Sequence, residues 1–315
     1  MSMLQLNQMA EWYRNQAGQS DATKVAYMSA IGAGIVCEPR LYWMLAKGLT
    51  VTFPRFDALP EAQVRAINEV PAELCPSPVP VSAALKILNY TFSYDYKALN
   101  ASGDPVRELA NQRALAAVSL RRTFNKYFFN GDSSLYPAQF DGLKRIAEME
   151  GSTVSIADNG GTLTLEKLDE AVDLAQQCAD GENGRMLIAM NSQTLRQLNN
   201  LLLNKSAMNL QWEKSGQIVA SYAGIPIMVV RGDAANNAIL GFTETQGESS
   251  ASASAYVITF ARDESEPGLF AAYDGPPEET IIPHQIGQKV SVDWAVALLA
   301  SHKNAVVRLK GITLS

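Results

Sequence analysis

The chain has 315 residues, a net charge of −6 and an isoelectric point near 5.1, which argues against a dedicated nucleic-acid reader with a broad basic face. Hydrophobic residues make up 47%, enough for two substructures with cores, whereas charged residues make up only 18%, as in proteins whose partners cover much of the surface. The three cysteines, Cys37, Cys75 and Cys178, are widely spaced and predict reduced thiols rather than a disulfide framework or a zinc site. We find neither a signal peptide nor a stretch of ~20 apolar residues, so we expect a cytoplasmic protein without a membrane partner.

The N-terminal segment, residues 1–47, is predicted to form an arm. Its beginning fits a short amphipathic helix, and residues 22–36 are small and apolar. Gly32-Ala33-Gly34 could suggest a dinucleotide-binding turn. That fingerprint would need a preceding strand and a third glycine at position 37, where the chain has Cys37. A packed or flexible connector is therefore the better interpretation.

Residues 48–96 are predicted to form an extended loop between two strands. Thr50–Phe53 alternates between polar and apolar residues, and Leu88–Tyr96 alternates over nine residues with one strongly aromatic face. The excursion between them is rich in proline and longer than thirty residues, which is unusual in a compact domain. Such a hairpin buries little of itself, so we expect it to lie on another surface.

A long helix follows, from Pro105 to Phe129. Asp104 is a suitable N-cap, Pro105 stands at the first helical position, and apolar residues recur at helical spacing. At 1.5 Å per residue this helix is roughly 37 Å long. Asn130-Gly131-Asp132 supplies its C-terminal stop. Such a rod suggests a scaffold for neighbours rather than the wall of a pocket.

Residues 151–257 are predicted to form an α+β unit with its own core. A helix begins after Thr164, Met186–Met190 is a short buried strand, and Asn191 or Ser192 caps a second helix. A strand pair with a tight turn is expected between Tyr222 and Val230. The low-complexity segment Gly247–Ala255 is predicted to be an exposed loop.

The C-terminal part returns to long strands. Val290 to Leu298 alternates cleanly, and Ala305 to Ile312 is a second strand. In the second strand Val307 and Leu309 share one face, and Arg308 and Lys310 share the other.

We find no catalytic, cofactor-binding or metal-binding constellation. The two histidines, His284 and His302, have no GxSxG or HExxH motif around them and are interpreted as surface residues of strands or loops. The acidic run from Asp263 to Glu266 lacks the glycine and the regular oxygen spacing of a calcium loop, which favours a solvated turn. An enzyme housed in residues 151–257 is the least supported hypothesis.

In this order, the elements resemble the major capsid proteins of tailed bacteriophages, which have the Hong Kong 97-type fold that encapsulins share. The resemblance covers about Leu45 to Ile312 and rests on the succession of segments, because none is specific alone. These segments are Phe128–Asp132, Gln139–Leu143, Ser221–Ile227, the strand around Trp294, and Ala305–Ile312.

The resemblance implies an α+β fold with a long spine helix, long antiparallel peripheral strands, an extended loop and a separate α+β axial domain. Each part then has an expected range: residues 1–47 for the N-terminal arm, 48–96 for the extended loop, 97–150 for the peripheral domain with its spine helix at 105–129, 151–257 for the axial domain, 258–300 for peripheral strands, and 301–315 for a C-terminal strand that returns to the axial domain.

The implied function is that of a major capsid (head) protein of a tailed double-stranded DNA bacteriophage or prophage. Such a protein assembles with itself into the hexamers and pentamers of an icosahedral shell in the host cytoplasm and ends in the virion. The implied partners are packaged DNA, bound without sequence preference, and portal, scaffolding and decoration proteins. The alternative is an encapsulin-type shell that encloses a protein cargo. No enzymatic activity and no cofactor are expected.

Two sets of residues are candidates for these contacts. Basic residues of the long helix could form ion pairs between subunits or face DNA phosphates: Arg107, Arg113, Arg121, Arg122 and Lys126. Residues of the extended loop could contact a neighbouring subunit: Phe53, Arg55, Phe56, Leu74 and Val79.

Two further expectations concern processing. No lysine stands between Phe53 and Pro80, so we expect no covalent crosslink of the kind that some family members form through Lys and Asn. The N-terminal segment is also too short for a fused scaffolding region, unless cleavage has removed one.

Overall fold

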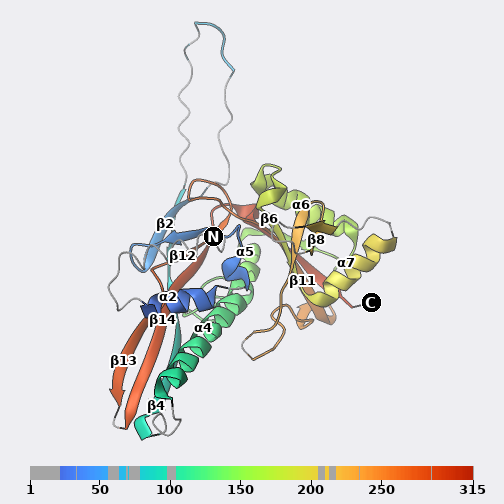
Figure 1. Ribbon diagram of the computed structural model, residues 1–315. Helices are drawn as coiled ribbons and strands as arrows, with labels where there is room; N and C mark the ends of the chain where they lie inside the picture. Colours follow the sequence, from blue (N-terminus) through green and yellow to red (C-terminus); the bar gives the residue numbers. More distant parts are fainter. Residues whose placement is uncertain are drawn as a thin grey trace.

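A long helix joins two β-sheets and gives the chain an α+β fold (Figure 1). The computed structural model describes residues 22–32, 34–55, 64–68, 70, 79–97, 104–204, 210–212, 218–233, 235–284 and 286–314. Within these ranges, no helix is both long and apolar enough to cross a membrane.

The long helix, α4 (Pro105–Asn130), begins and ends where the sequence signals stand. The side chain of Asp104 accepts a hydrogen bond from the backbone N–H of Arg107 at 3.1 Å, and Pro105 occupies the first turn. The N–H of Gly131 donates to the carbonyl of Tyr127 at 2.9 Å and closes the last turn. One stripe of the helix is buried, as helical periodicity requires: Ala116, Ala117, Leu120, Phe124 and Phe128.

The first sheet lies along α4. Its order is β1 (Trp43–Leu45), β12 (Leu269–Tyr273), β14 (Gly287–Ala300) and β13 (Glu278–His284), and β4 (Lys86–Asp95) also pairs with β14. The β4–β14 pair is antiparallel and runs from Lys86–Val296 to Asp95–Gly287. The aromatic face expected for β4 packs against the core with Trp294 of β14, whose ring lies 5.5 Å from Phe124.

A separate hairpin projects beyond the first sheet. It consists of β2 (Thr50–Arg55) and β3 (Val79–Ala84), which pair antiparallel along their whole length. The two strands form a two-stranded sheet of their own. Its base is anchored because Phe53 packs on Phe270 of β12 with ring centroids 5.4 Å apart.

The N-terminal helix α2 (Ala22–Ile31) and the short 3-10 helix η2 (Gly34–Cys37) pack against α4. Tyr27, Ile31 and Ile35 are buried in the main core, and Trp43 stacks on Trp294 at 5.7 Å. The prediction of an arm over residues 1–47 is therefore wrong for the described residues between 22 and 47.

The second sheet has the order β5 (Thr153–Ser155), β15 (Val306–Thr313), β11 (Ser249–Thr259), β6 (Met186–Met190), β9 (Ile225–Val229), β8 (Ile218–Tyr222) and β7 (Leu210–Trp212), and β10 (Glu244–Gln246) also pairs with β11. Helices α6 (Leu165–Ala179) and α7 (Ser192–Asn204) cover one face. The end of α4 and the short helix α5 (Leu143–Glu150) lie against the other.

The strands of the second sheet alternate between two cores. Ala255 and Val257 of β11 face α6 and α7, whereas Tyr256 and Ile258 face the end of α4. The rings of Tyr256 and Phe129 are 6.0 Å apart. The expectation of a unit with its own core thus holds for one face only, because the other face shares a core with the long helix.

The low-complexity segment Gly247–Ala255 is not the exposed loop that its composition suggested. Strand β11 begins at Ser249, and Ser252, Ala253, Ser254 and Ala255 are buried. Alternating serine and alanine are small enough to let β15 and β10 approach, and the hydroxyl of Ser252 donates to the carbonyl of Glu244 at 2.8 Å. Buried serines with partners cost little, so composition alone was misleading here.

Several local signals are confirmed. Thr164 accepts the N–H of Lys167 at the start of α6, and Asn191 accepts the N–H of Thr194 at 2.7 Å at the start of α7. Asp263 organises a turn by accepting the N–H of Ser265 at 2.7 Å, and this pattern of hydrogen bonds holds its pKa below the usual range. His302 accepts the N–H of Asn304 and caps the 3-10 helix η4 (Lys303–Ala305).

Candidate assembly surfaces and the spine junction

The projecting hairpin carries large apolar side chains that are almost fully exposed in the described part of the chain. Among the described residues beyond β2 and β3, Val64, Ile67 and Val70 are 101%, 94% and 89% exposed. Exposure this complete of three neighbouring large apolar residues is typical of a surface that another molecule covers. Sequence reasoning did not single out these three residues, although they recur at intervals of three.

The loop residues chosen from the sequence have different environments. Val79 is exposed at the start of β3, as a contact residue should be. Arg55 forms an ion pair with Glu150 at the end of α5. Phe53 is buried against Phe270, so an intersubunit role for Phe53 is wrong: alternation along β2 turns its ring into the core of its own chain. Phe56 and Leu74 lie outside the described residues.

Arg113, one of the basic candidates on α4, joins three elements. Its guanidinium donates to both carboxylate oxygens of Glu279 on β13, from Nε at 2.9 Å and from Nη2 at 2.8 Å. The hydroxyl of Tyr27 on α2 donates to the same carboxylate at 2.9 Å. Burial, reinforced by Glu279, raises the pKa of Tyr27, and hydrogen bonding to Glu279 raises the pKa of Arg113. Arg113 therefore links α4 to β13, and through Glu279 to α2, within its own subunit.

The other basic candidates divide into two groups. Nη1 of Arg121 donates to the carbonyl of Ala30 at 3.3 Å, and Nζ of Lys126 lies 3.4 Å from a carboxylate oxygen of Asp233. Arg107 is exposed and Arg122 is half-buried, and among the described residues neither side chain has a hydrogen bond or ion pair. Of the five basic side chains, three are therefore bound to groups of their own chain, which leaves Arg107 and Arg122 for a charged partner.

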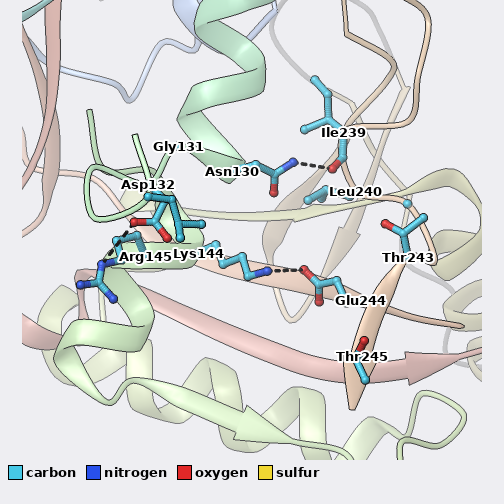
Figure 2. Close-up of a pocket in the computed structure, with 12 residues that line it drawn as sticks. Asn130, Gly131, Asp132, Lys144, Arg145, Ile239, Leu240, Thr243, Glu244 and Thr245 are labelled. Carbon is cyan, nitrogen blue, oxygen red and sulfur yellow. Dashed lines mark hydrogen bonds and ion pairs between the residues drawn. The ribbon is translucent and has the colours of Figure 1, made fainter. Parts of the chain in front are cut away.

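A cavity of about 510 Å³ lies where the long helix meets the second sheet (Figure 2). The end of α4, the beginning of α5 and residues 239–245 surround it. Nδ2 of Asn130 donates to the carbonyl of Ile239 at 2.7 Å on one wall. Two ion pairs line the rest, Lys144 with Glu244 at 3.9 Å and Arg145 with Asp132 at 3.8 Å. Hydrogen bonds from Ser134 lower the pKa of Asp132.

Beside this cavity, Arg308 of β15 is buried among carboxylates. Its Nη1 donates to Glu148 of α5 at 2.6 Å, its Nη2 donates to Glu244 of β10 at 2.9 Å, and its Nε donates to the hydroxyl of Ser254 at 3.0 Å. Lys144 of α5 also pairs with Glu244, so that acidic and basic side chains alternate from Glu148 through Arg308 and Glu244 to Lys144. These ion pairs attach α5 to the sheet. The sequence placed Arg308 and Lys310 on one face correctly but carried no sign that Arg308 would be buried, because its partners are far away in the chain.

These groups form hydrogen bonds and ion pairs that join α5, β10 and β15. In the described ranges no cluster of three or more His, Cys, Asp or Glu side chains could hold a metal ion. Burial raises the pKa of the Cys178 thiol to about 12 and also raises that of Cys37, so neither thiol is ionised near neutral pH. What the arrangement can do is hold a long helix at a defined position on a sheet and project an apolar hairpin.

Comparison with solved structures gives the same fold at low sequence identity. The holo-SrpI encapsulin complex from Synechococcus elongatus PCC 7942 has a TM-score of 0.60 and 11% identity, covering 88% of both chains. The procapsid of satellite phage P4, which includes the size determination (Sid) protein, has a TM-score of 0.58 and 12% identity, covering 100% of this chain and 99% of that one. The capsid of a native GTA particle has a TM-score of 0.56 and 12% identity, covering 89% and 93%.

Sequence comparison identifies the family. No curated protein matches the chain. The family model described as the SU10 major capsid protein matches residues 9–236, more than half of the chain. The structural neighbours show the fold alone, a Hong Kong 97-type fold that phage capsid proteins and encapsulins share. The chain therefore belongs to the SU10 major capsid protein family.

Proposed function

We propose that this chain is the major head subunit of a tailed double-stranded DNA phage or prophage. Copies assemble in the host cytoplasm into hexamers and pentamers, and these close into the icosahedral shell of the virion. The family match over residues 9–236 carries this proposal. The nearly complete exposure of Val64, Ile67 and Val70 supports self-association, because a monomer would leave this apolar surface in water.

The elements divide among the roles that this fold implies. The spine helix and the first sheet correspond to the peripheral domain of residues 97–150 and 258–300, to which strands β1 and β4 add residues from outside these ranges. The second sheet corresponds to the axial domain of residues 151–257, joined by the strand within residues 301–315. The pairing of β15 with β11 and β5 supports that last assignment, and the β2–β3 hairpin supports an extended loop over residues 48–96. Residues 1–21 of the expected arm lie outside the described residues.

Packaged DNA would contact the inner surface without sequence readout. Arg107 and Arg122 are the best candidates on the spine, because Arg113, Arg121 and Lys126 have partners in their own chain. Changing both to Gln should weaken the salt dependence of DNA retention in filled shells, since fewer counterions are released per subunit. An unchanged salt dependence would remove the spine from the DNA-facing surface. Portal, scaffolding and decoration proteins are the further partners that a phage head implies.

Electron microscopy of the purified protein tests the main proposal. Uniform closed shells, or the rings and tubes formed by incomplete closure, are the expected products. A stable monomer at high concentration would contradict it. The contents of shells isolated from cells decide between the two shell functions: double-stranded DNA supports the phage head, whereas an enclosed protein would support the encapsulin alternative, with which the chain shares its fold.

A further inference from the structure

The segment between β9 and β10, residues 231–244, contacts the spine helix, the residue that caps α7, and strand β15. We call this segment the strap; all of it except residue 234 is described. It leaves the second sheet after Val229, reaches the spine helix α4, and returns to the sheet at Glu244. The strap contacts the spine through Lys126 and Asn130, and Figure 2 shows the second of these contacts.

The far end of the strap is a tight turn built on Asp233. One oxygen of this buried carboxylate accepts the N–H groups of Ala235 and Asn237, each at 2.9 Å. The other oxygen lies 3.4 Å from Nζ of Lys126, a residue of the last two turns of the spine. A single side chain thus shapes the turn and attaches it to the helix.

The middle of the strap is held on both sides. Ile239 and Leu240 are buried in the core that the spine shares with the second sheet. The carbonyl of Ile239 accepts from Nδ2 of Asn130, the last residue of the spine, at 2.7 Å. The next carbonyl, that of Leu240, accepts from Nδ2 of Asn191 at 2.9 Å, and Asn191 caps α7. Two consecutive carbonyls therefore link the end of the spine to the second sheet.

The near end is fastened by the buried charges. Glu244 accepts from Nη2 of Arg308 at 2.9 Å, which ties the strap to β15. The strap thus contacts the spine near Asp233, β15 at Glu244, and both the spine and the second sheet in between.

The apolar core alone would hold the spine at a less defined angle. Apolar contact is non-directional, whereas hydrogen bonds require particular distances and angles. The cavity of about 510 Å³ next to the end of the spine also leaves that side of the helix without packed atoms. The helix is about 39 Å long, so a tilt of about 5° at this end would move its other end by about 3 Å.

We propose that the strap sets the angle between the spine and the second sheet, with Asn130 and Asp233 as its positioning residues, and so determines the curvature of the shell. The inference rests on the proposed function insofar as it concerns shells. Because copies of this one chain build the whole closed shell, a small change of angle within the subunit is repeated throughout and changes the number of subunits at which the shell closes.

The test uses two near-isosteric substitutions in the full-length protein. Asn130→Asp replaces the donor to Ile239 by an oxygen, and Asp233→Asn removes the charge that faces Lys126. Asn111→Asp is the matched control, because Asn111 is exposed on the same helix and has no hydrogen bond among the described residues. Ile188→Val is a second control that lowers Tm through the opposite core.

Two measurements are made on each variant: the distribution of shell diameters by cryo-electron microscopy, and hydrogen exchange in the strap and the last turn of the spine. Asn130→Asp and Asp233→Asn should shift or broaden the diameters and accelerate exchange there by about tenfold, whereas both controls should keep the wild-type diameters. If Asn130→Asp does not fold, Lys126→Gln removes one contact of the strap with the spine more gently, and Asn111→Asp remains its control.

The outcomes separate the two proposals. Wild-type shells with unchanged diameters and exchange in the strap variants would overturn the role of the strap and leave the shell function intact. A wild-type protein that forms no assemblies would overturn the shell function. Hydrogen exchange in the monomer would then test whether the strap positions the spine, and unchanged exchange in Asn130→Asp and Asp233→Asn would overturn that role. Equal diameter shifts in Ile188→Val would show that lowered stability, rather than the strap, controls closure.

Discussion

Arg308 of β15 and Glu148 of α5 are 160 residues apart in the chain, yet their side chains meet at 2.6 Å beneath the end of the spine. Only 6% of Arg308 is exposed, and it also pairs with Glu244. This contact explains how the short helix α5 keeps its place on the sheet, and it supplies the first prediction.

Arg308→Met should lower the free energy of unfolding by about 3 kcal/mol, because Glu244 would stay largely buried with only the more distant Lys144, at 3.9 Å, as its cation. Urea denaturation of the unassembled protein measures this change. Arg122→Met is the matched control, since Arg122 is half-buried and has no ion pair among the described residues, and it should cost less than about 0.5 kcal/mol. If both substitutions lowered the free energy of unfolding equally, the buried ion pairs of Arg308 would contribute nothing specific to stability.

Asp233 should make stability depend on pH in the acid range. Hydrogen bonds from Asn237 and Ala235, together with Lys126, hold its pKa below the usual range. A carboxyl whose folded-state pKa is lowered stabilises the fold above its unfolded pKa of about 3.9, and that contribution disappears as pH falls through the folded value. Wild type should therefore exceed Asp233→Asn in stability at pH 7, and the difference should shrink below about pH 4.

Denaturation curves of both proteins at pH 7, 4 and 3 test this sign. A difference that stays constant over this range would assign the effect of the substitution to geometry rather than to charge.

The contact among Tyr27, Arg113 and Glu279 should fasten α2 to the spine. Arg113→Met would leave Glu279, whose side chain is 10% exposed, with only the hydroxyl of Tyr27, and should cost about 2 kcal/mol. Tyr27→Phe removes one hydrogen bond and should cost about 1 kcal/mol. Both substitutions should speed hydrogen exchange within α2. Arg107→Met serves as the control, because Arg107 is exposed. If Arg113→Met lowered the free energy of unfolding as little as Arg107→Met does, the role of Arg113 would be contradicted.

The apolar tip of the projecting hairpin should matter for assembly and little for folding. Val64→Ser with Ile67→Ser changes two side chains that are 101% and 94% exposed, so the free energy of unfolding should change by less than about 0.5 kcal/mol. The yield of closed shells, measured by sedimentation, should fall sharply. Val64→Ile with Ile67→Val keeps the tip apolar and should assemble like the wild type. Normal yields from the serine variant would exclude these two residues from the interface.

Local signals in the sequence determined most of the elements. Asp104, Thr164 and Asn191 accept hydrogen bonds from backbone N–H groups where their helices begin, because capping depends on residues within one turn. The alternation of β4 and β14 was equally visible, since a half-buried strand shows its two faces directly in sequence. The order of these elements was enough to suggest the capsid fold, which the family match and the structural neighbours confirm.

Only the tertiary structure decided how the parts meet. The burial of Arg308 and of the serines in β11 depends on strands that are distant in the chain, and local composition carries no trace of them. Gly131 and Gly142 illustrate the same limit. The N–H of Gly142 donates to the carbonyl of Gly131 at 2.9 Å, and a Cβ on Gly142 would lie 2.4 Å from the carbonyl oxygen of Tyr127. In sequence Gly131 indicated only where the helix ends, and the close approach that requires both glycines exists only once the chain has folded back on the spine.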